Sequence, residues 1–373
     1  MNIGVFGGSF NPVHNQHVKI AALAVEKLKL NKLLIVPSNI SPGKNQTDNS
    51  RHRLNMAELA FAKVKNIEVC DYEIKSGGES YTYLTIDYFK KKYPHDSLFF
   101  ILGGDAFLEL YSWKNPELIV KNAEIAVYER ENSEIFNKAL LDFKCKYNKE
   151  TRVISAEVSD ISSTKIRILI SFGQDVSEYL DNDVCKYISD NNLYNENQYL
   201  KALNECLSKK RIKHTAYVTA FAMKYYRRLN LNYDDVFAAC ALHDISKEAG
   251  NEILLNYNKA DNLNLPLPVI HAFYGAEFAK KEFGIENGNI LNAIRYHTTG
   301  RAGMSDLEKL VFVADLLEDN RVYKDIDYLR KCVEKDFESG FRECVKEEYK
   351  HLSETKKPED ICALSRGAYE YYK

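Results

Sequence analysis

The chain has 373 residues, of which 45% are hydrophobic and 28% are charged, and its formal net charge is −2 at pH 7. These values are typical of a globular protein with about two or three domains, and they exclude an intrinsically disordered chain. The nearly balanced charge gives no electrostatic basis for binding duplex nucleic acid, so we expect no nucleic-acid partner.

The N-terminal residues show no basic region followed by an apolar stretch, so no signal peptide is expected. No apolar run approaches the ~18 residues needed to cross a bilayer, so we expect no membrane partner. The eight cysteines are scattered without a CxxC pair, which favours reduced thiols over a disulfide framework or a zinc ribbon. We therefore expect a cytoplasmic protein, and we leave its oligomeric state open.

Short β-rich runs alternate with helical patterns up to about residue 190. The runs IGVF, LLIVP, IEVCDYEI, SLFFILGG, AEIAVYE and RVISAEV read as strands, and they cover residues 3–6, 33–37, 67–74, 97–104, 123–129 and 152–158. Between them, residues 17–30, 53–64 and 83–93 have apolar side chains at helical spacing. This alternation predicts an α/β, Rossmann-like domain whose mostly parallel sheet is covered on both faces.

The pattern changes after a polar stretch at residues 189–198, SDNNLYNENQ, which we interpret as a linker. Beyond it, residues 216–229, 235–245, 269–283 and 307–320 are helical in spacing, and no convincing strand alternation follows. We therefore predict two domains with separate cores, an α/β domain over residues 1–192 and an all-α domain over residues 196–373.

The first strand ends in the stretch GVFGGSFNPVHNQH at residues 4–17, where ligands of open α/β sheets bind. Gly7 and Gly8 let the backbone approach a phosphate closely. His14 and His17 are three residues apart at the start of a predicted helix, so both should lie on one face, beside free N–H groups that suit phosphate. The stretch lacks a Walker lysine and is not GxGxxG, so neither a P-loop nor a dinucleotide fingerprint applies.

This stretch resembles the GGxFxPxHxGH signature of the nucleotidyltransferase superfamily, specifically bacterial nicotinate-nucleotide adenylyltransferases. ISSTKIR at residues 161–167 matches the superfamily's second signature, ISSTxIR. The resemblance implies an ATP site made of Gly7, Gly8, Ser9, Phe10, His14, His17, Ser162, Ser163, Thr164 and Arg167. Three further motifs are similar to the family's acceptor motifs: SPGK, SYTYLT, and GGD followed by the single tryptophan. They imply a nicotinate-nucleotide site made of Lys44, Tyr81, Thr82, Thr85, Asp105 and Trp113.

The implied reaction is the transfer of AMP from ATP to nicotinate mononucleotide, with Mg²⁺ on the departing pyrophosphate. Such a transfer depends mainly on positioning and charge stabilisation. His14 and His17 would face the reacting phosphates, and Lys44 and Arg167 would neutralise the pyrophosphate. The chain departs from the family pattern at Gln16, where the signature has glycine, and at Leu84, where an acidic residue is usual.

The acceptor remains open at this point. Nicotinamide mononucleotide is the nearest alternative, because recognition of the amide or the acid can lie in backbone contacts that a sequence does not show. Phosphopantetheine is a further acceptor in the superfamily, but the SYT motif and Trp113 argue against it.

The helical half contains four histidines and two aspartates of the types that bind metals, in the order His214, His243, Asp244, His271, His297 and Asp315. Together with HDISK, RYHTTGR and VADLLEDNR, this order resembles the HD phosphohydrolase superfamily, and in particular its YqeK-like branch of symmetrical diadenosine tetraphosphate hydrolases. Six such ligands exceed one tetrahedral site and suit two adjacent ions, with Fe the first expectation and Mn or Co as alternatives.

Within this predicted centre, Asp244 is the expected bridge, because its two oxygens can reach both ions. His214, His243 and Asp315 would complete one site, and His271 and His297 would hold the second. The candidate groups for the remaining phosphates are Lys247, Arg295, Thr298, Arg301 and Arg321, with Lys247 also placed in the catalytic set.

The implied substrate is diadenosine tetraphosphate, cleaved symmetrically to two ADP. A nucleotidase and an enzyme that cleaves guanosine tetra- and pentaphosphates remain alternatives. A module that senses a nucleotide without catalysis is an alternative of another class, and it would have no hydrolytic rate to lose on mutation of His243 or Asp244.

Overall fold

The computed structural model describes residues 1–40, 49–129, 133–155, 161–248 and 265–373, and its contacts divide the chain into two compact units. One unit comprises Met1–Ile166 and Val176–Leu193, and the other comprises Arg167–Asp175 and Tyr194–Lys373. The segment Arg167–Asp175 therefore belongs by its contacts to the second unit, which the sequence pattern did not indicate. The predicted cut between residues 192 and 196 lies beside the other junction and stays a prediction.

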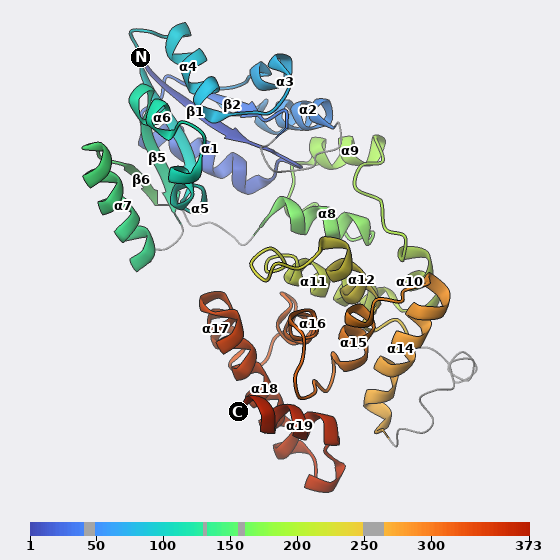
Figure 1. Ribbon diagram of the computed structural model, residues 1–373. Coiled ribbons are helices and arrows are strands. Elements are labelled where there is room, and N and C mark those ends of the chain that lie inside the picture. Colours follow the sequence, from blue (N-terminus) through green and yellow to red (C-terminus); the bar gives the residue numbers. More distant parts are fainter. Residues whose placement is uncertain (41–48, 130–132, 156–160, 249–264) are drawn as a thin grey trace. The chain divides into compact units, whose positions relative to one another are not determined.

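The first unit contains one parallel sheet, as the α/β pattern predicts. Its strands, in chain order, are β1 (Asn2–Gly8), β2 (Lys32–Pro37), β3 (Ile67–Val69), β4 (Ser97–Gly103), β5 (Glu124–Glu129) and β6 (Arg152–Ser155). They pair in the order β3-β2-β1-β4-β5-β6, and each pair of neighbouring strands is parallel. Figure 1 shows these strands in blue to green, with the helices of the same unit around them.

The helices of this unit follow the strands along the chain. They are α1 (Asn15–Lys27), α2 (Ser50–Phe61), α3 (Tyr72–Ser76), α4 (Thr82–Lys92), α5 (Gly104–Leu108), α6 (Pro116–Asn122), α7 (Glu134–Tyr147) and α9 (Asn182–Asp190), with the short 3-10 turn η1 (Leu110–Ser112). Helix α8 (Ser163–Ser171) begins in this unit, and its residues from Arg167 onward group with the second unit. Alternate residues of each strand point to opposite faces of the sheet. On β1, for example, Ile3 and Val5 join a buried cluster that also contains Ile86 and Phe89 of α4 and Ile119 of α6.

One predicted strand, residues 67–74, is wrong over its second half. Only Ile67 to Val69 pair with β2, and the chain then turns at Asp71 into α3. The ring of Tyr72 stacks on Tyr88 of α4, with 3.9 Å between the ring centroids. The segment therefore leaves the sheet because its aromatic side chain packs onto a neighbouring helix. The end of the last predicted strand, residues 156–158, lies outside the described residues.

The second unit is helical throughout its described residues, as the spacing predicts. Its helices are α10 (Leu200–Cys206), α11 (Lys209–Ala222), α12 (Tyr233–Leu242), α14 (Leu267–Phe283), α15 (Gly288–Tyr296), α16 (Asp306–Leu317), α17 (Ile326–Lys335), α18 (Phe337–Thr355) and α19 (Ala363–Tyr372), with the 3-10 turn η2 (Pro358–Asp360). In this unit α11 packs on α12 and α16, and α15 packs on α12, α14 and α16. These contacts bring together the five helices that carry or immediately precede the predicted metal ligands.

No helix among the described residues combines the length and apolarity that a bilayer crossing requires.

Candidate functional sites

A cavity of about 730 Å³ opens at the carboxyl ends of β1 and β4 in the first unit. From β1 the chain continues to β2 on one side, and from β4 it continues to β5 on the other, so the cavity lies where the strand order reverses. Open α/β sheets bind their ligands at such a switch point. Gly7 and Gly8 of β1 and Gly103 of β4 line it, and a Cβ on Gly7 would meet nothing closer than 4.0 Å. The cavity therefore exposes bare backbone to a ligand.

The two opening histidines lie against each other at the start of α1. His14 is the N-cap residue of this helix, and its imidazole stacks on that of His17, with ring centroids 3.7 Å apart. The backbone N–H of His14 donates to Nδ1 of His17 over 3.1 Å. Nδ1 is thus the acceptor, and the neutral ring carries its proton on Nε2. Burial and the neighbouring His14 lower the pKa of His17 well below its ordinary value, so this neutral form is favoured.

The loop that leads to these histidines is held by buried side chains. Phe10 is only 2% exposed and has a positive φ of 48°, and its ring meets those of Phe6 and His17 edge-on. Arg53 of α2 is 1% exposed and donates to the carbonyl oxygens of Ser9 and Asn39 over 2.8 and 2.7 Å. Phe10 and His17 both line the cavity. Phe10 therefore supports the histidine as well as the cavity wall, and Arg53 is a positioning residue that the sequence analysis missed.

The predicted acceptor residues are divided between the cavity and other places. Tyr81, Thr82, Thr85 and Trp113 line the cavity, whereas Asp105 is exposed in the first turn of α5 and does not line it. Thr85 Oγ1 donates to the carboxyl of Glu73, another lining residue. Lys44 lies outside the described residues, so its predicted role is neither supported nor opposed.

The second signature forms the start of α8. Ser162 Oγ accepts from the backbone N–H of Lys165 over 3.2 Å, and Ser163 Oγ donates to the carbonyl of Pro12 over 2.9 Å, which ties this helix to the loop before α1. Thr164 is half-buried. Arg167 groups with the second unit, where burial lowers its pKa and Tyr233 is its largest electrostatic neighbour. Its predicted pyrophosphate contact stays a prediction.

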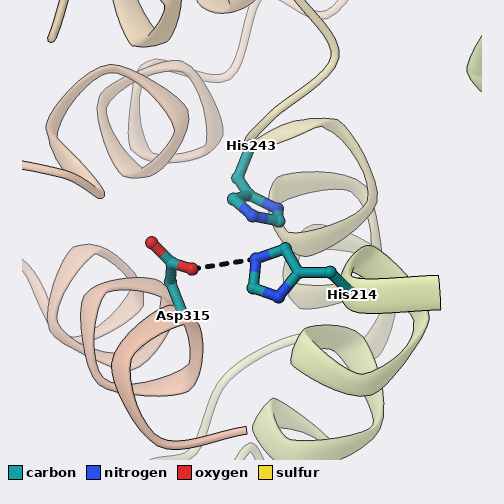
Figure 2. A group of neighbouring side chains, drawn as sticks. All are labelled: His214, His243 and Asp315. Carbon is teal, nitrogen blue, oxygen red and sulfur yellow. Dashed lines mark ion pairs between the residues drawn. The ribbon is translucent and has the colours of Figure 1, made fainter. Parts of the chain in front are cut away.

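The second unit gathers the predicted metal ligands into one buried cluster. His214 comes from α11, His243 and Asp244 directly follow α12, His271 lies in α14, His297 directly follows α15, and Asp315 lies in α16. Potential ligand atoms of His214, His243 and Asp315 all lie within 4.8 Å of one another, and so do those of His243, Asp244 and His297. In Figure 2 the side chains of the first group converge, and His214 Nε2 is 3.0 Å from Asp315 Oδ1.

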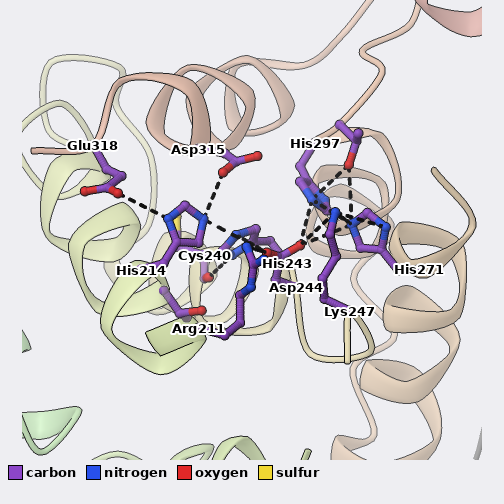
Figure 3. Close-up of polar contacts among 12 residues, drawn as sticks. Arg211, His214, Cys240, His243, Asp244, Lys247, His271, His297, Asp315 and Glu318 are labelled. Atoms are coloured by element: carbon purple, nitrogen blue, oxygen red, sulfur yellow. Dashed lines mark hydrogen bonds and ion pairs between the residues drawn. The ribbon is translucent and has the colours of Figure 1, made fainter. Parts of the chain in front are cut away.

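Asp244 occupies the middle of the cluster and turns its two oxygens to different neighbours, as Figure 3 shows. Oδ2 lies 3.7 Å from His243 Nε2 and 4.0 Å from His214 Nε2. Oδ1 lies 3.1 Å from His271 Nε2 and 3.3 Å from His297 Nε2. The side chain is 2% exposed. One carboxylate thus faces two separate groups of histidines.

The backbone sets the tautomers of two of these histidines. His243 Nδ1 lies 2.7 Å from the carbonyl oxygen of Cys240, and His297 Nδ1 lies 2.7 Å from that of Ile294. A carbonyl accepts only, so each Nδ1 is the donor and each Nε2 presents its lone pair to the cluster. His243 Nε2 is buried and has no hydrogen-bond partner among the described residues. A buried acceptor of this kind fits a metal ion, which would use the unshared lone pair.

The charges of the cluster also suit metal binding. Burial lowers the pKa of His243 and of His271 to about 4, so both rings are neutral near pH 7. Burial opposes ionisation of Asp244 and Asp315, but the surrounding histidines outweigh it and hold the pKa of both carboxyls below the ordinary value. Neutral imidazoles and ionised carboxylates are the protonation states that bind cations. His214 differs, because its contacts with Asp315 and Glu318 raise its pKa to about 9, so a metal ion would have to displace a proton from it.

A second cavity, of about 720 Å³, borders this cluster. His297 and Asp315 line it, together with Lys247, Thr298 and Arg321 from the predicted polyphosphate set. Lys247 Nζ is 4.0 Å from Asp244 Oδ1, and Arg321 Nη2 is 2.9 Å from Asp315 Oδ1. These side chains therefore present cationic and hydroxyl groups beside the cluster.

Arg295 and Arg301 do not line that cavity. Arg295 donates to Asn292 and pairs with Glu277 over 3.3 Å. Arg301 donates through Nε and Nη2 to both carboxylate oxygens of Glu308, over 2.6 and 3.0 Å. Both guanidinium groups are therefore engaged with protein carboxylates, and the structure offers no support for their predicted phosphate contacts.

Two residues at the cluster were missed by the sequence analysis. Arg211 Nη1 donates to Asp244 Oδ2 over 2.8 Å, and a carboxylate oxygen of Glu318 lies 3.2 Å from His214 Nδ1. Glu318 is 2% exposed. Arg211 is three residues before His214 on α11, so the two share a helix face, and Glu318 is three residues after Asp315, directly past the end of α16. That spacing is the signal that could have identified them.

Two family models match the chain in the same order as the two units. A cytidylyltransferase-like model matches residues 5–168, and an HD domain model matches residues 211–320. A relative from Mycoplasma genitalium, named probable nicotinate-nucleotide adenylyltransferase/Ap4A hydrolase, is 30% identical over 321 residues, which cover 85% of this chain and 87% of the relative. A probable nicotinate-nucleotide adenylyltransferase from Clostridium tetani is 34% identical over 197 residues, which cover 51% of this chain and 97% of the relative.

Solved structures also match each half. A Plasmodium falciparum nicotinic acid mononucleotide adenylyltransferase complexed with NaAD is 23% identical, with a TM-score of 0.46, over 52% of this chain and 98% of its own. A protein from Clostridium acetobutylicum, named as a predicted HD superfamily hydrolase involved in NAD metabolism, is 28% identical, with a TM-score of 0.41, over 46% of this chain and 93% of its own.

Proposed function

Because this chain belongs to the family that joins a nicotinate-nucleotide adenylyltransferase to an Ap4A hydrolase, we propose that it catalyses two reactions at separate sites. The N-terminal domain transfers AMP from ATP to nicotinate mononucleotide and releases pyrophosphate, which forms deamido-NAD. The C-terminal domain hydrolyses diadenosine tetraphosphate symmetrically to two molecules of ADP.

In the first reaction, a phosphate oxygen of nicotinate mononucleotide attacks the α-phosphorus of ATP. The new P–O bond replaces the bond to the pyrophosphate, which leaves with its electron pair. His17 supports this step because its Nε2–H is a hydrogen-bond donor beside bare glycine backbone. Such a donor stabilises charge that grows on the phosphate oxygens in the transition state. Mg²⁺ bound to the ATP polyphosphate would offset its negative charge.

The acceptor nucleotide is proposed to lie against Trp113 and the start of α4. Trp113 lines the cavity, and its indole packs edge-on against Phe100, so the core fixes one edge of a possible stacking surface. Tyr81 and Thr82 form the beginning of α4 in the same cavity. The adenylyltransferase named in the relatives acts on the nicotinate form, which favours the acid over the amide.

In the second reaction, His214, His243, Asp244, His271, His297 and Asp315 would hold two metal ions, which we propose to be Fe, with Mn or Co as alternatives. The buried lone pair of His243 and the division of the Asp244 oxygens between two histidine groups support this proposal. Metal ions in such a site supply the positive charge that activates water and stabilises a leaving phosphate.

The chain's own cations would hold the rest of the substrate. Lys247 and Arg321 line the cavity beside the cluster and can pair with the phosphates, while Thr298 can donate a hydrogen bond. Burial lowers the pKa of Lys247, and a bound polyphosphate would favour its charged form. All eight cysteines are free thiols, which supports the proposed cytoplasmic location.

A product screen tests both halves of the proposal. Purified protein is supplied with ATP and either mononucleotide, and separately with diadenosine tetraphosphate and Fe²⁺ or Mn²⁺. The first reaction should give deamido-NAD and pyrophosphate, and the second should give ADP as its only nucleotide product. AMP with ATP from the tetraphosphate would refute symmetrical cleavage, and release of phosphate from mononucleotides or of pyrophosphate from guanosine polyphosphates would favour the alternatives. A wild type that binds nucleotides without hydrolysing them, and that loses this binding on mutation of His243 or Asp244, would favour a sensor.

A further inference from the structure

The nucleotide cavity contains one full positive charge near its acceptor end. Lys114 is the only lysine or arginine among the described residues that line this cavity. It directly follows Trp113, the proposed stacking residue, and it forms no ion pair with any described residue. An ammonium group that faces a binding cavity without a protein counterion is available to a ligand anion.

The position of Lys114 is fixed on both sides. Trp113 ends the η1 turn in an extended conformation and packs against Phe100, with ring centroids 6.2 Å apart. Asn115 adopts the left-handed conformation, with φ 52°, and Pro116 begins α6. The chain at Lys114 is therefore a short connection between a packed indole and a helix start, so its backbone is held in place.

The side chain of Lys114 reaches towards another part of the cavity wall. Its Nζ lies 4.1 Å from the centroid of the Tyr81 ring, in the range of a cation–π contact. Tyr81 is the residue before α4 and also lines the cavity. The ring holds the ammonium without neutralising it, because an aromatic face carries no net charge.

The carboxyls among the described residues near Lys114 form no ion pair with it. Glu73 accepts from Thr85, and burial raises the pKa of its carboxyl. Glu79 accepts from the hydroxyl of Tyr81 and does not line the cavity. Glu109 lines the cavity but makes no ion pair with Lys114. Among the described residues that line the cavity, this ammonium is therefore the cationic group that can pair with a negative charge on the acceptor.

We infer that Lys114 selects the acid form of the acceptor, by pairing its ammonium with the carboxylate of the nicotinate ring. This inference rests on the proposed adenylyltransferase function of the same cavity. Nicotinate and nicotinamide mononucleotide have nearly the same shape and the same phosphate, and they differ by one negative charge on the ring substituent. A cationic side chain at that substituent favours the acid over the amide, because a charge-assisted hydrogen bond is stronger than a neutral one.

The test compares both mononucleotides in the full chain. kcat/KM is measured for each in the wild type, in Lys114→Met, in Lys114→Arg and in Lys121→Met. Lys121 is an exposed lysine of α6 that does not line the cavity, so it is the matched control. We expect Lys114→Met to lower kcat/KM for the acid about tenfold, mainly through KM, and to leave the amide unchanged. Lys114→Arg should retain most of the preference.

Equal losses for both substrates would show that Lys114 contacts the shared phosphate, and this would overturn the inference. An unchanged preference in Lys114→Met would overturn it as well. Both outcomes leave the adenylyltransferase proposal intact, because transfer still occurs. A wild type that transfers AMP to neither mononucleotide would instead refute the proposed function itself, and a wild type that prefers the amide would refute the acid assignment and the inference together.

Discussion

The nucleotide cavity and the metal cluster both use histidine, but the Nε2 atom that faces the ligand is a donor in one and an acceptor in the other. At the cavity, the N–H of His14 occupies Nδ1 of His17, so Nε2 is left as a donor. At the cluster, carbonyl oxygens occupy Nδ1 of His243 and His297, so Nε2 is left as an acceptor. A donor suits phosphate oxygens, and an acceptor suits a metal cation.

The origin of the difference is the position of each histidine on its helix. His17 is in the first turn of α1, where backbone N–H groups lack partners. His243 and His297 directly follow the last turns of α12 and α15, where carbonyl groups lack partners. Helix ends therefore determine which ring nitrogen is free, and with it the kind of ligand that the histidine can serve.

The largest expected effect comes from Asp244→Ala. Because its two oxygens face both histidine groups, this substitution should remove both metal ions and all measurable hydrolysis. Adenylyl transfer should be unchanged, since the residue belongs to the other unit. Elemental analysis of protein purified without a chelating tag gives the metal content, which should be close to two per wild-type chain.

His271→Ala is the matched variant for that experiment. His271 faces only Oδ1 of Asp244, so we expect the loss of one ion and most of the rate. A wild-type ratio near one in active enzyme would refute the dinuclear centre and leave the hydrolase assignment standing.

His17→Ala should have the opposite pattern to Asp244→Ala, since it should impair adenylyl transfer and spare hydrolysis. Loss of a donor that acts on developing charge should lower kcat for adenylyl transfer by about 10²–10³-fold, with a smaller change in KM for ATP. Hydrolysis and metal content should stay at wild-type values. If turnover in this variant matched the wild type, His17 would not be the transition-state donor.

The histidine pair at the nucleotide cavity could be predicted from the sequence more completely than the metal cluster. His14 and His17 lie three residues apart after a glycine turn, so their proximity follows from helix geometry, and the structure brings their rings together. The metal ligands come from five separate helices, and only the family resemblance joined them. Their burial and the central place of Asp244 depend on long-range packing that spacing does not encode.

Two further features of the chain also depend on packing between distant residues, namely the untested phosphate contact of Arg301 and the boundary of one predicted strand. Arg301 follows a glycine in HTTGR, but whether its guanidinium meets a phosphate or Glu308 depends on the fold of the turn between them. The strand expected at residues 67–74 ends early because Tyr72 stacks on Tyr88, which is far along the chain. By contrast, Arg211 and Glu318 lie at helical spacing from predicted ligands and could have been found.

A smaller effect is expected from Glu318→Gln. This substitution tests a histidine, His214, whose Nδ1 lies beside a carboxylate instead of a backbone carbonyl. Burial alone lowers the pKa of His214. Its hydrogen bonds to Asp315 and Glu318 outweigh burial and raise this pKa to about 9. An amide in place of Glu318 can still orient the ring but carries no charge, so metal affinity should fall about 10- to 100-fold. Competition with a graded chelator measures this. Glu318→Ala should be worse than Glu318→Gln, and equal affinity in all three proteins would exclude a role at the metal.

The smallest effect is expected at Gln16, the departure from the family signature. Gln16 is in the first turn of α1, between the two histidines, and is 5% exposed, but it does not line the nucleotide cavity. Its side chain therefore does not occupy the nucleotide site. Gln16→Gly should leave kcat and KM unchanged or slightly improved, and it should lower the free energy of unfolding by up to about 1 kcal/mol, because glycine weakens a helix.

Steady-state kinetics beside a thermal unfolding scan separates these two effects. A lower Tm with unchanged turnover would show that Gln16 serves packing while the flanking histidines serve the reaction. A loss of kcat comparable to that of His17→Ala would instead mean that the glutamine holds the histidine pair in place. In that case the tautomer of His17 would depend on its buried neighbour as well as on the backbone N–H of His14.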